Sequence, residues 1–294
     1  MKNQPQILYI DPMVDFGFKK IFKDSGKKQL IIRPLNEIFS LNIEDIDIRE
    51  SEQPGLTEQE RKVTYDMYCD TKDGRSFIIE VQIANQTYFM ERALFYSART
   101  ITEKGEKGDW NYNLPPVFFL GLLNFDMRHL EPEKADPARF IHKFSLREDE
   151  THEQMSRALR FAFMEIARFD KRKEECETFE ERFLYLMKNL PTFAEKPELW
   201  DDPYFNEFME QATFASMTRE EQDAYIASMK QKWDYKNTID YAREEGREEG
   251  REEGREEGMK QGALEVARRM KSMGLNDNVI LQATGLTEDQ IKAL

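Results

Sequence analysis

The sequence predicts an α/β domain with a mixed sheet, followed by an all-helical C-terminal region. Two observations predict this fold class: helical and strand patterns alternate through the N-terminal half, and strand patterns end near residue 171. The chain has 294 residues, of which 39% are hydrophobic. That share is too high for a disordered chain and lets about one or two domains bury a core.

Each predicted element has its own pattern. From Asp11 to about Phe39, apolar residues return every three or four positions and Gly26 interrupts them, which predicts two helices joined by an Asp-Ser-Gly turn. Residues 44–50 have the pattern of a short strand, and a Pro-Gly loop follows from Glu52. Further along, we expect a helix over 88–102, strands over 117–123, 139–146 and 159–166, and helices near 177–190, 203–215 and 219–242.

A β-hairpin is predicted between the second and third helices. Residues 62–71 alternate in polarity, with Val63, Tyr65, Met67 and Cys69 on one side, and residues 76–83 are rich in β-branched and aromatic types. A three-residue loop that ends in a left-handed Gly74 pairs Thr71 with Arg75. That loop sets the register of the whole hairpin.

In this register four polar side chains share one face of the hairpin. Asp66 lies opposite Glu80, and Thr64 lies opposite Gln82. A two-residue loop would place the two carboxylates on opposite faces, so the arrangement depends on the loop length. Two carboxylates about 5 Å apart repel each other unless a proton or a cation lies between them.

A divalent cation would make this pair a catalytic site. Mg²⁺ or Mn²⁺ prefers oxygen ligands, lowers the pKa of a bound water and stabilises charge on a phosphoryl oxygen, which suits phosphodiester hydrolysis. On spacing alone, however, the more common explanation is the solvated face of an ordinary half-buried hairpin. The spacing therefore does not establish a nuclease.

Several short segments match a known family when they are taken together. They are Asp15–Phe22 (DFGFKKIF), Leu35 with Asn36, Tyr65 with Asp66 and Gly74, Ile79–Gln82, and Arg92 with Tyr96. In order and spacing they resemble the PD-(D/E)xK nuclease superfamily across about residues 10–170, and more closely its Rpn branch of recombination-promoting nucleases, also labelled putative transposases. The resemblance implies a restriction-endonuclease-like mixed sheet flanked by helices, Mg²⁺ or Mn²⁺ as cofactor, and double-stranded DNA as partner.

The resemblance also implies roles at the hairpin. Asp66 and Glu80 would hold the metal with help from the Val81 carbonyl, and Asp15 would complete the metal shell or steer its waters. Gln82 stands where the superfamily has lysine, although glutamine is usual in this branch. Because glutamine carries no charge and is not a base, Gln82 would at most orient the attacking water.

Four further residues are expected to contact DNA. Lys19, one turn after Asp15, and the adjacent Lys20 belong to a basic cluster with Lys23, Lys27 and Lys28. Arg92 and Tyr96, at i and i+4 on one helix, would position the scissile phosphate. Without the resemblance, the more common explanation of this pair is a helix that packs on the sheet while Arg92 extends to solvent.

The C-terminal region leaves alternatives open. Predicted boundaries are 1–170 for the nuclease core, 171–242 for a helical extension, 243–262 for an Arg/Glu/Gly segment and 263–294 for a small helical element. Each glycine of the Arg-Glu-Glu-Gly repeat costs a helix about 0.8–1.0 kcal/mol relative to alanine, whereas a Glu–Arg pair returns roughly 0.2–0.5 kcal/mol. We therefore favour a flexible charged linker over a helix whose glycine row admits a second copy.

The last 19 residues have the outline of a helix-turn-helix, with a capping-box pattern at Thr287 and Gln290. The second helix begins with Glu288 and Asp289 and has one basic residue, Lys292, which suits a DNA groove poorly. We therefore favour a packing or dimerisation element here, and expect any homo-oligomer to form through this region.

Charge and composition narrow the function. The net charge is −14, but residues 1–130 account for −3 and residues 131–294 for −11, so the acidity does not exclude DNA from the N-terminal half. No apolar run approaches the roughly 20 residues that span a bilayer, no signal-peptide pattern is present, and the two cysteines form no paired motif. We expect a cytoplasmic protein without a membrane partner.

Two functional hypotheses follow. The first is a metal-dependent DNA endonuclease associated with recombination, transposition or defence against foreign DNA. The second is a nuclease-like fold that binds DNA or forms oligomers without turnover. RNA is a weaker alternative substrate, because the core chemistry does not distinguish the sugars.

Overall fold

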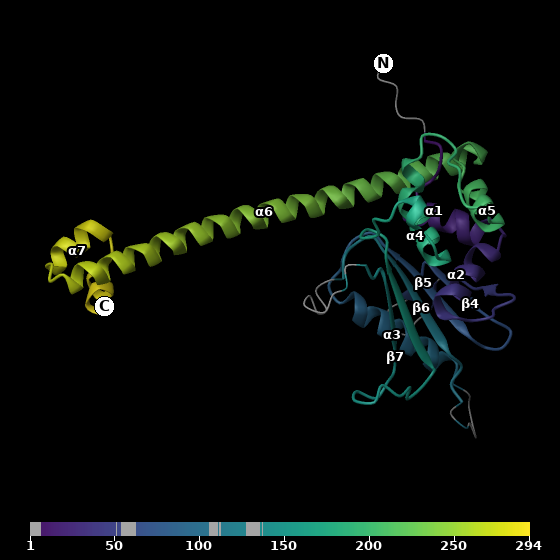
Figure 1. Ribbon diagram of the computed structural model, residues 1–294, viewed down its shortest axis with the longest axis horizontal. Coiled ribbons are helices and arrows are strands. Elements are labelled where there is room, and N and C mark those ends of the chain that lie inside the picture. The colour runs from purple at the N-terminus through teal and green to yellow at the C-terminus, as the bar shows by residue number, and fades with distance from the viewer. Residues whose placement is uncertain are drawn as a thin grey trace, which may run out of the picture. The chain divides into compact units, whose positions relative to one another are not determined.

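The structure, a computed structural model, describes residues 7–50, 52–53, 63–105, 111, 113–127, 136 and 138–294 (Figure 1). The chain divides into two compact units, Met1–Lys232 and Trp233–Leu294. The described helices are α1 (Asp15–Phe18), α2 (Gln29–Phe39), α3 (Phe89–Glu103), α4 (Phe179–Asn189), α5 (Pro203–Gln211), α6 (Arg219–Ser272), α7 (Asp277–Thr284) and α8 (Glu288–Lys292), with a π-helical turn η1 (Lys19–Asp24) and 3-10 turns η3 (Lys173–Glu175), η4 (Leu190–Thr192) and η5 (Phe214–Ser216). The described strands are β1 (Asp47–Ile48), β2 (Glu52–Gln53), β3 (Val63–Thr64), β4 (Met67–Asp70), β5 (Ser76–Gln82), β6 (Val117–Leu123), β7 (Ile141–Ser145) and β8 (Leu159–Glu165).

The first unit is built on a mixed six-stranded sheet in the order β1-β4-β5-β6-β8-β7. The central strands β5, β6 and β8 are parallel, while β1, β4 and β7 join antiparallel. Strand β6 is buried along its whole length, as its unbroken apolar run predicts. The predicted mixed sheet is confirmed, and its parallel strands end at one edge with Gln82, Leu123 and Glu165 aligned.

Helices cover both faces of this sheet. Phe77 and Ile79 of β5 belong to a core that also contains buried residues of α1, α2, α4 and α5, whereas Ile78 packs with Phe89 and Ala93 of α3 in a second core. Successive strand residues point to opposite faces, so this division follows directly from the alternation. Glu80 and Gln82 have the parity of Ile78 and therefore face the α3 side.

The predicted continuous strand over residues 62–71 is wrong. Residues Val63–Thr64 form β3, which pairs with β2, so Thr64 lies opposite Glu52 and not opposite Gln82. The chain then bends at Asp66 before β4 begins. Because this interruption resets the alternation, Tyr65 packs with Tyr68 in the α3-side core, with ring centroids 5.6 Å apart, and not with Met67. Glu52, predicted to begin a loop, lies in β2, and the rest of that loop falls outside the described residues.

The favoured prediction of a flexible linker over the Arg-Glu-Glu-Gly repeat is wrong, because α6 runs through the repeat without interruption. Both ends of α6 pack against other elements: Tyr225 is 2% exposed in the first unit, and Ala267 is fully buried in the second. Since helix nucleation is the costly step, a repeat anchored at both ends only has to propagate the helix. None of the described helices combines the length and apolar character that a membrane crossing requires.

The second unit closes on a small core of its own. Ala267 of α6 packs with Ile280 of α7, Leu286 in the turn and Ile291 of α8. Gly285 ends α7 with a φ of +67°, a left-handed conformation that favours glycine. The predicted capping box is confirmed, because the Thr287 side chain accepts from the Gln290 backbone and the Gln290 side chain accepts from the Thr287 backbone.

Gly17, in the segment Asp15–Phe22, allows a test of how α1 packs. A Cβ at Gly17 would lie 2.0 Å from the carbonyl oxygen of Asp11, whose carboxylate accepts from Lys232 at 2.5 Å and whose backbone N–H donates to the Tyr225 hydroxyl at 2.9 Å. We expect Gly17→Ala to force α1 away from this anchored turn and to lower the free energy of unfolding by on the order of 1–3 kcal/mol, measured by urea denaturation.

The matched control is Gly250→Ala in α6, where nothing lies within 4 Å of the added methyl group. There the same substitution should stabilise the helix by about 0.5–1 kcal/mol. If Gly17→Ala leaves the free energy of unfolding unchanged or raises it, the close approach is contradicted.

Candidate active site

The turn of the β4–β5 hairpin has the predicted loop. The Thr71 N–H donates to the Arg75 carbonyl at 2.9 Å, the Gly74 N–H donates to the Thr71 carbonyl at 3.0 Å, and Gly74 has a φ of +88°. The strands pair Met67 with Ile79 and Asp70 with Ser76. The predicted register is therefore confirmed from Met67 to Asp70 but not at Thr64, and Asp66 reaches the hairpin end next to Glu80.

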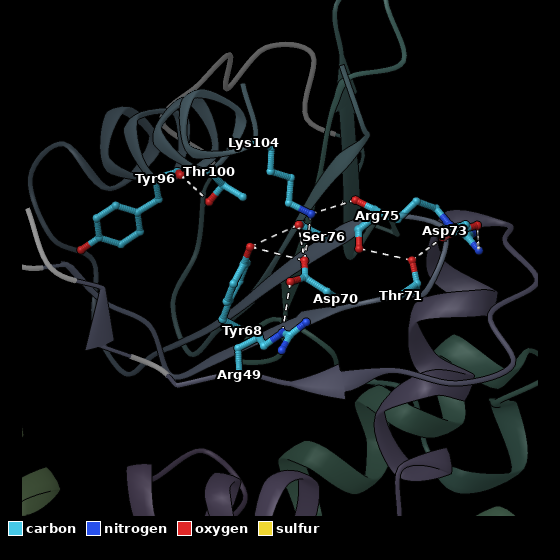
Figure 2. Close-up of polar contacts among 11 residues, drawn as sticks. Arg49, Tyr68, Asp70, Thr71, Asp73, Arg75, Ser76, Tyr96, Thr100 and Lys104 are labelled. Carbon is cyan, nitrogen blue, oxygen red and sulfur yellow. Dashed lines mark hydrogen bonds and ion pairs between the residues drawn. The ribbon is translucent and has the colours of Figure 1, made fainter. Parts of the chain in front are cut away.

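A group of polar contacts holds the hairpin at its turn (Figure 2). One oxygen of Asp70 accepts from the Ser76 hydroxyl at 2.6 Å and from the Lys104 ammonium at 2.9 Å, and the other accepts from Arg49 at 3.4 Å. Lys104 also donates to the Gly74 carbonyl at 2.8 Å, which ties the end of α3 to the turn. These contacts fix the register from the end opposite to the candidate site.

At the other end of the hairpin, two hydrogen bonds connect Asp66 to the segment of β5 that contains Glu80. The Asp66 N–H donates to Oε1 of Glu80 at 3.3 Å, and Oδ2 of Asp66 accepts from the Val81 N–H at 2.7 Å. Glu80 is 5% exposed. Asp66 thus takes the position along β5 that a partner strand would occupy, and its carboxylate lies beside that of Glu80.

The environment of this pair disfavours two negative charges. Burial and the charge of Asp66 raise the pKa of Glu80 to about 8, against smaller opposing effects of a hydrogen bond from Asp66 and the charge of Arg92. Burial also raises the pKa of Asp66, although the hydrogen bond from Val81 opposes it. The charge of Asp15 adds to the rise in the Asp66 pKa, while Lys19 and Arg92 oppose it. The pair therefore retains a proton or attracts a cation.

The oxygen atoms around the pair fit a hard divalent cation. The N–H and C=O of one strand residue point to the same edge, so the Val81 carbonyl faces the edge where Asp66 lies. Asp66, Glu80 and this carbonyl provide the oxygen donors that Mg²⁺ or Mn²⁺ prefers, with further positions left to water. Within the part of the chain that the structure describes, no three His, Cys, Asp or Glu side chains gather into a metal-holding group.

Asp15 therefore lies near the pair without joining it. Its carboxylate is bound to Lys19 at 2.7 Å, and its side chain is 60% exposed. Its effect on the Asp66 pKa places it within electrostatic reach of the site. Gln82 is closer: it is 9% exposed, and its amide nitrogen lies 3.4 Å from Oε2 of Glu80.

Helix α3 brings Arg92 and Tyr96 to the same site. Burial and then the charge of Glu80 raise the pKa of Tyr96, and the charge of Arg92 acts on both carboxylates. The Tyr96 ring packs edge-on against Tyr65 at 5.3 Å. Arg92 donates to Oε1 of Gln86 at 2.5 Å, in an exposed contact with the connection before α3.

The predicted basic cluster is largely paired with acidic residues. Lys20 binds Glu221 of α6 at 2.5 Å and is 25% exposed in its side chain. Lys27 binds Glu207 and Lys28 binds Asp45, each at 2.8 Å. Of the two lysines expected to contact DNA, Lys19 carries a charge that lowers the pKa of Asp66.

Two features near the site were missed from the sequence. The Tyr65 hydroxyl is buried and, among the described residues, is the one buried side-chain polar atom without a hydrogen-bond partner. A cavity of about 450 Å³ lies under the connection from β5 to α3 and is lined by Asn85, Gln86, Tyr88 and Phe89 among others. The sequence signal for this cavity was the polar segment 85–87 directly before Tyr88 and Phe89.

Comparison with known families gives two matches. Residues 12–242 match the model of a family described as PD-(D/E)XK nuclease family transposase, and residues 260–294 match the C-terminal HTH domain of the Rpn/YhgA-like nuclease family. The mixed sheet flanked by helices is accordingly a restriction-endonuclease-like fold. Searches of curated proteins and of solved structures gave no match.

The second match corrects the preference for a packing or dimerisation element at the C-terminus. The acidic start of α8 argued against a helix-turn-helix, but that motif is defined by its helices and turn. Here α7 and α8 are joined by three residues that begin with Gly285. The charges of the five residues of α8 do not report how the helices and the turn are arranged.

The carboxylate pair predicts cation binding by the folded protein. Mg²⁺ or Mn²⁺ should raise the melting temperature, because a cation between Asp66 and Glu80 offsets their repulsion. Asp66→Asn or Glu80→Gln should remove this rise. Glu91→Gln, at an exposed position of α3, is the matched control and should retain it. Equal losses in all three variants, measured by calorimetry, would contradict the two-carboxylate arrangement.

The same pair predicts how the metal-free protein responds to pH. The pKa of Glu80 rises from about 4.3 in the unfolded chain to about 8, so its contribution to stability is complete below about pH 4 and is lost as the pH rises through 8. In EDTA, the melting temperature should fall between about pH 5 and 9, and Glu80→Gln should flatten this fall. Glu91→Gln, at an exposed position of α3, should keep the wild-type slope. A Glu80→Gln curve parallel to wild type would refute the assignment.

Proposed function

The chain belongs to the PD-(D/E)XK nuclease family transposases, and from this premise we propose that it is a divalent-metal-dependent endonuclease that hydrolyses phosphodiester bonds of double-stranded DNA. One observation carries the proposal: Asp66 and Glu80 are adjacent and largely buried, and each is fixed by a hydrogen bond to the other's segment of chain. The match of residues 260–294 to an HTH domain supports DNA as the partner.

In this proposal Asp66, Glu80 and the Val81 carbonyl would hold Mg²⁺ or Mn²⁺. Such a cation would supply an acidified water and stabilise negative charge on the phosphoryl oxygens. The protein keeps the two carboxylates in place through the Val81 N–H and the Asp66 N–H, so little reorganisation is needed at the reacting phosphate.

The surrounding side chains act on the water and the phosphate. Gln82, with its amide nitrogen 3.4 Å from Glu80, orients the attacking water without accepting its proton. Arg92 and Tyr96 hold the scissile phosphate from α3. Lys19 binds a neighbouring phosphate and Asp15 steers waters next to the cation, whereas the pairing of Lys20 with Glu221 leaves Lys20 a smaller share of DNA binding. Recombination, transposition or defence against foreign DNA are processes that such an activity serves.

A second candidate is a DNA-binding protein that does not turn over. The specific observation in its favour is Gln82, which supplies neither the charge nor the base of the lysine that the superfamily has at this position. The two candidates differ in one measurable respect, because only the first predicts strand breaks that depend on Asp66.

Plasmid cleavage tests the proposal. Purified protein should nick or linearise supercoiled DNA with Mg²⁺ or Mn²⁺, and Asp66→Ala should reduce the rate to background. Gln82→Ala should lower the rate by about 10–100-fold, as expected for a residue that orients a water. Cleavage that persists in Asp66→Ala would refute the site. Salt-sensitive binding without cleavage under either ion would favour the second candidate.

A further inference from the structure

The cavity beside α3 opens at the edge of the sheet where the parallel strands end. Its walls include Asn85, Gln86, Tyr88 and Phe89 from the connection after β5, and Phe125 and Met127 after β6. Its volume of about 450 Å³ falls within the range of about 300–1,000 Å³ that is usual for small-molecule sites. In open α/β sheets, ligands bind outside the carboxyl ends of the strands, which is where this cavity lies.

Arg92 connects the cavity to the carboxylate pair. Its guanidinium donates to Gln86 in the cavity wall at 2.5 Å and lies 5.5 Å from the centre of the Phe89 ring. The same guanidinium acts electrostatically on Asp66 and Glu80. Arg92 therefore joins the cavity wall to the site of the proposed scissile phosphate.

Tyr88 is presented at the cavity in an unfavourable backbone conformation. It has a φ of +63° and is 72% exposed, at the residue that precedes α3. A left-handed conformation at a residue other than glycine, asparagine or aspartate costs on the order of 1–2 kcal/mol. Such strain concentrates at ligand-binding positions.

The inner part of the wall is buried and held by contacts with the sheet. Phe89 is 5% exposed and contacts Phe125 edge-on at 6.0 Å. The Met127 N–H donates to the Glu165 carboxylate at 2.5 Å, and Glu165 is itself fully buried and bound to His142 at 2.8 Å. Phe89 and Met127 thus give the cavity a fixed inner side.

The lining matches one class of ligand. Aromatic rings offer faces for stacking, and the Asn85 and Gln86 side chains offer amide donors and acceptors for the edge of a planar ring. Among the described residues that line the cavity, none carries a positive charge and Glu91 carries a negative one, so these side chains favour a neutral ring over a phosphate. This combination suits a nucleobase.

We propose that the cavity binds a single unstacked nucleobase next to the scissile phosphate, with its ring against Tyr88 and its edge toward Asn85 and Gln86. The substrate is then DNA that has an unpaired or flipped nucleotide at the cleavage position. This inference rests on the proposed nuclease function, which places the phosphate between Arg92 and the carboxylate pair.

Three labelled duplexes test the inference: one fully paired, one with a single unpaired adenine, and one with an unpaired abasic nucleotide at the same position. Affinity is measured by fluorescence anisotropy in EDTA, so that the readout does not require cleavage. Wild-type protein should bind the adenine duplex about 10-fold more tightly than the abasic duplex, which is the size of one base–aromatic stacking contact.

Variants assign this preference to the cavity. Tyr88→Asn removes the ring while asparagine tolerates the left-handed conformation, and it should abolish the preference for adenine. Tyr88→Phe should keep it. Tyr241→Asn, at a tyrosine 69% exposed in the second unit, should also keep it. Any of three results would overturn the inference. They are equal wild-type binding of the adenine and abasic duplexes, no binding of any duplex, and a preference for adenine that survives Tyr88→Asn.

Cleavage assays with Mg²⁺ or Mn²⁺ separate this inference from the proposed function. If wild-type protein cleaves DNA but shows no preference for adenine, the base site is refuted and the nuclease stands. If the preference depends on Tyr88 and no duplex is cleaved, the base site stands and the nuclease is refuted.

Discussion

The bend at Asp66 is the local feature on which the site depends. If β3 and β4 formed one strand, a partner residue would take the N–H and C=O of Val81 into the sheet ladder. Instead the Asp66 carboxylate accepts from the Val81 N–H, and the Asp66 N–H donates to Glu80. The open edge of β5 therefore becomes a place where two carboxylates and a carbonyl converge. The cost is a pair of acidic groups whose pKa values are raised by burial, and at Glu80 also by the charge of Asp66, and a bound cation would offset that cost.

The turn of the β4–β5 hairpin and helix α3 fix the positions of the two carboxylates. Asp70 and Lys104 connect the turn to the end of α3, so the register and the helix are fixed together (Figure 2). A slip by one residue would move Glu80 to the opposite face of the sheet, away from Arg92 and Tyr96. The polar contacts at the turn thus determine which helix the carboxylates meet.

Local patterns predicted the parts of the structure that depend on local chemistry. The loop from Lys72 to Gly74 requires a left-handed glycine, which a sequence displays, and the register follows from it. The bend before β4 was not predictable in this way, because it depends on β2 as a second partner for Thr64. The pairing of Lys20 with Glu221 joins residues 201 positions apart, and no periodicity reports such a contact. The helical Arg-Glu-Glu-Gly repeat likewise depends on packing at both ends of α6, beyond the repeat itself.

The distribution of charge around the site gives Arg92 a central position. Gln82 is neutral, Lys19 is bound to Asp15, and Lys20 is bound to Glu221, so Arg92 is the cation that acts on both carboxylates. The same guanidinium holds the wall of the cavity through Gln86. A metal ion between Asp66 and Glu80 would offset the charges that attract Arg92 and leave its remaining donors for a phosphate. Metal binding and phosphate binding would then favour one another through a single side chain, which would let the proposed site gather positive charge at a phosphate although Gln82 stands in place of lysine.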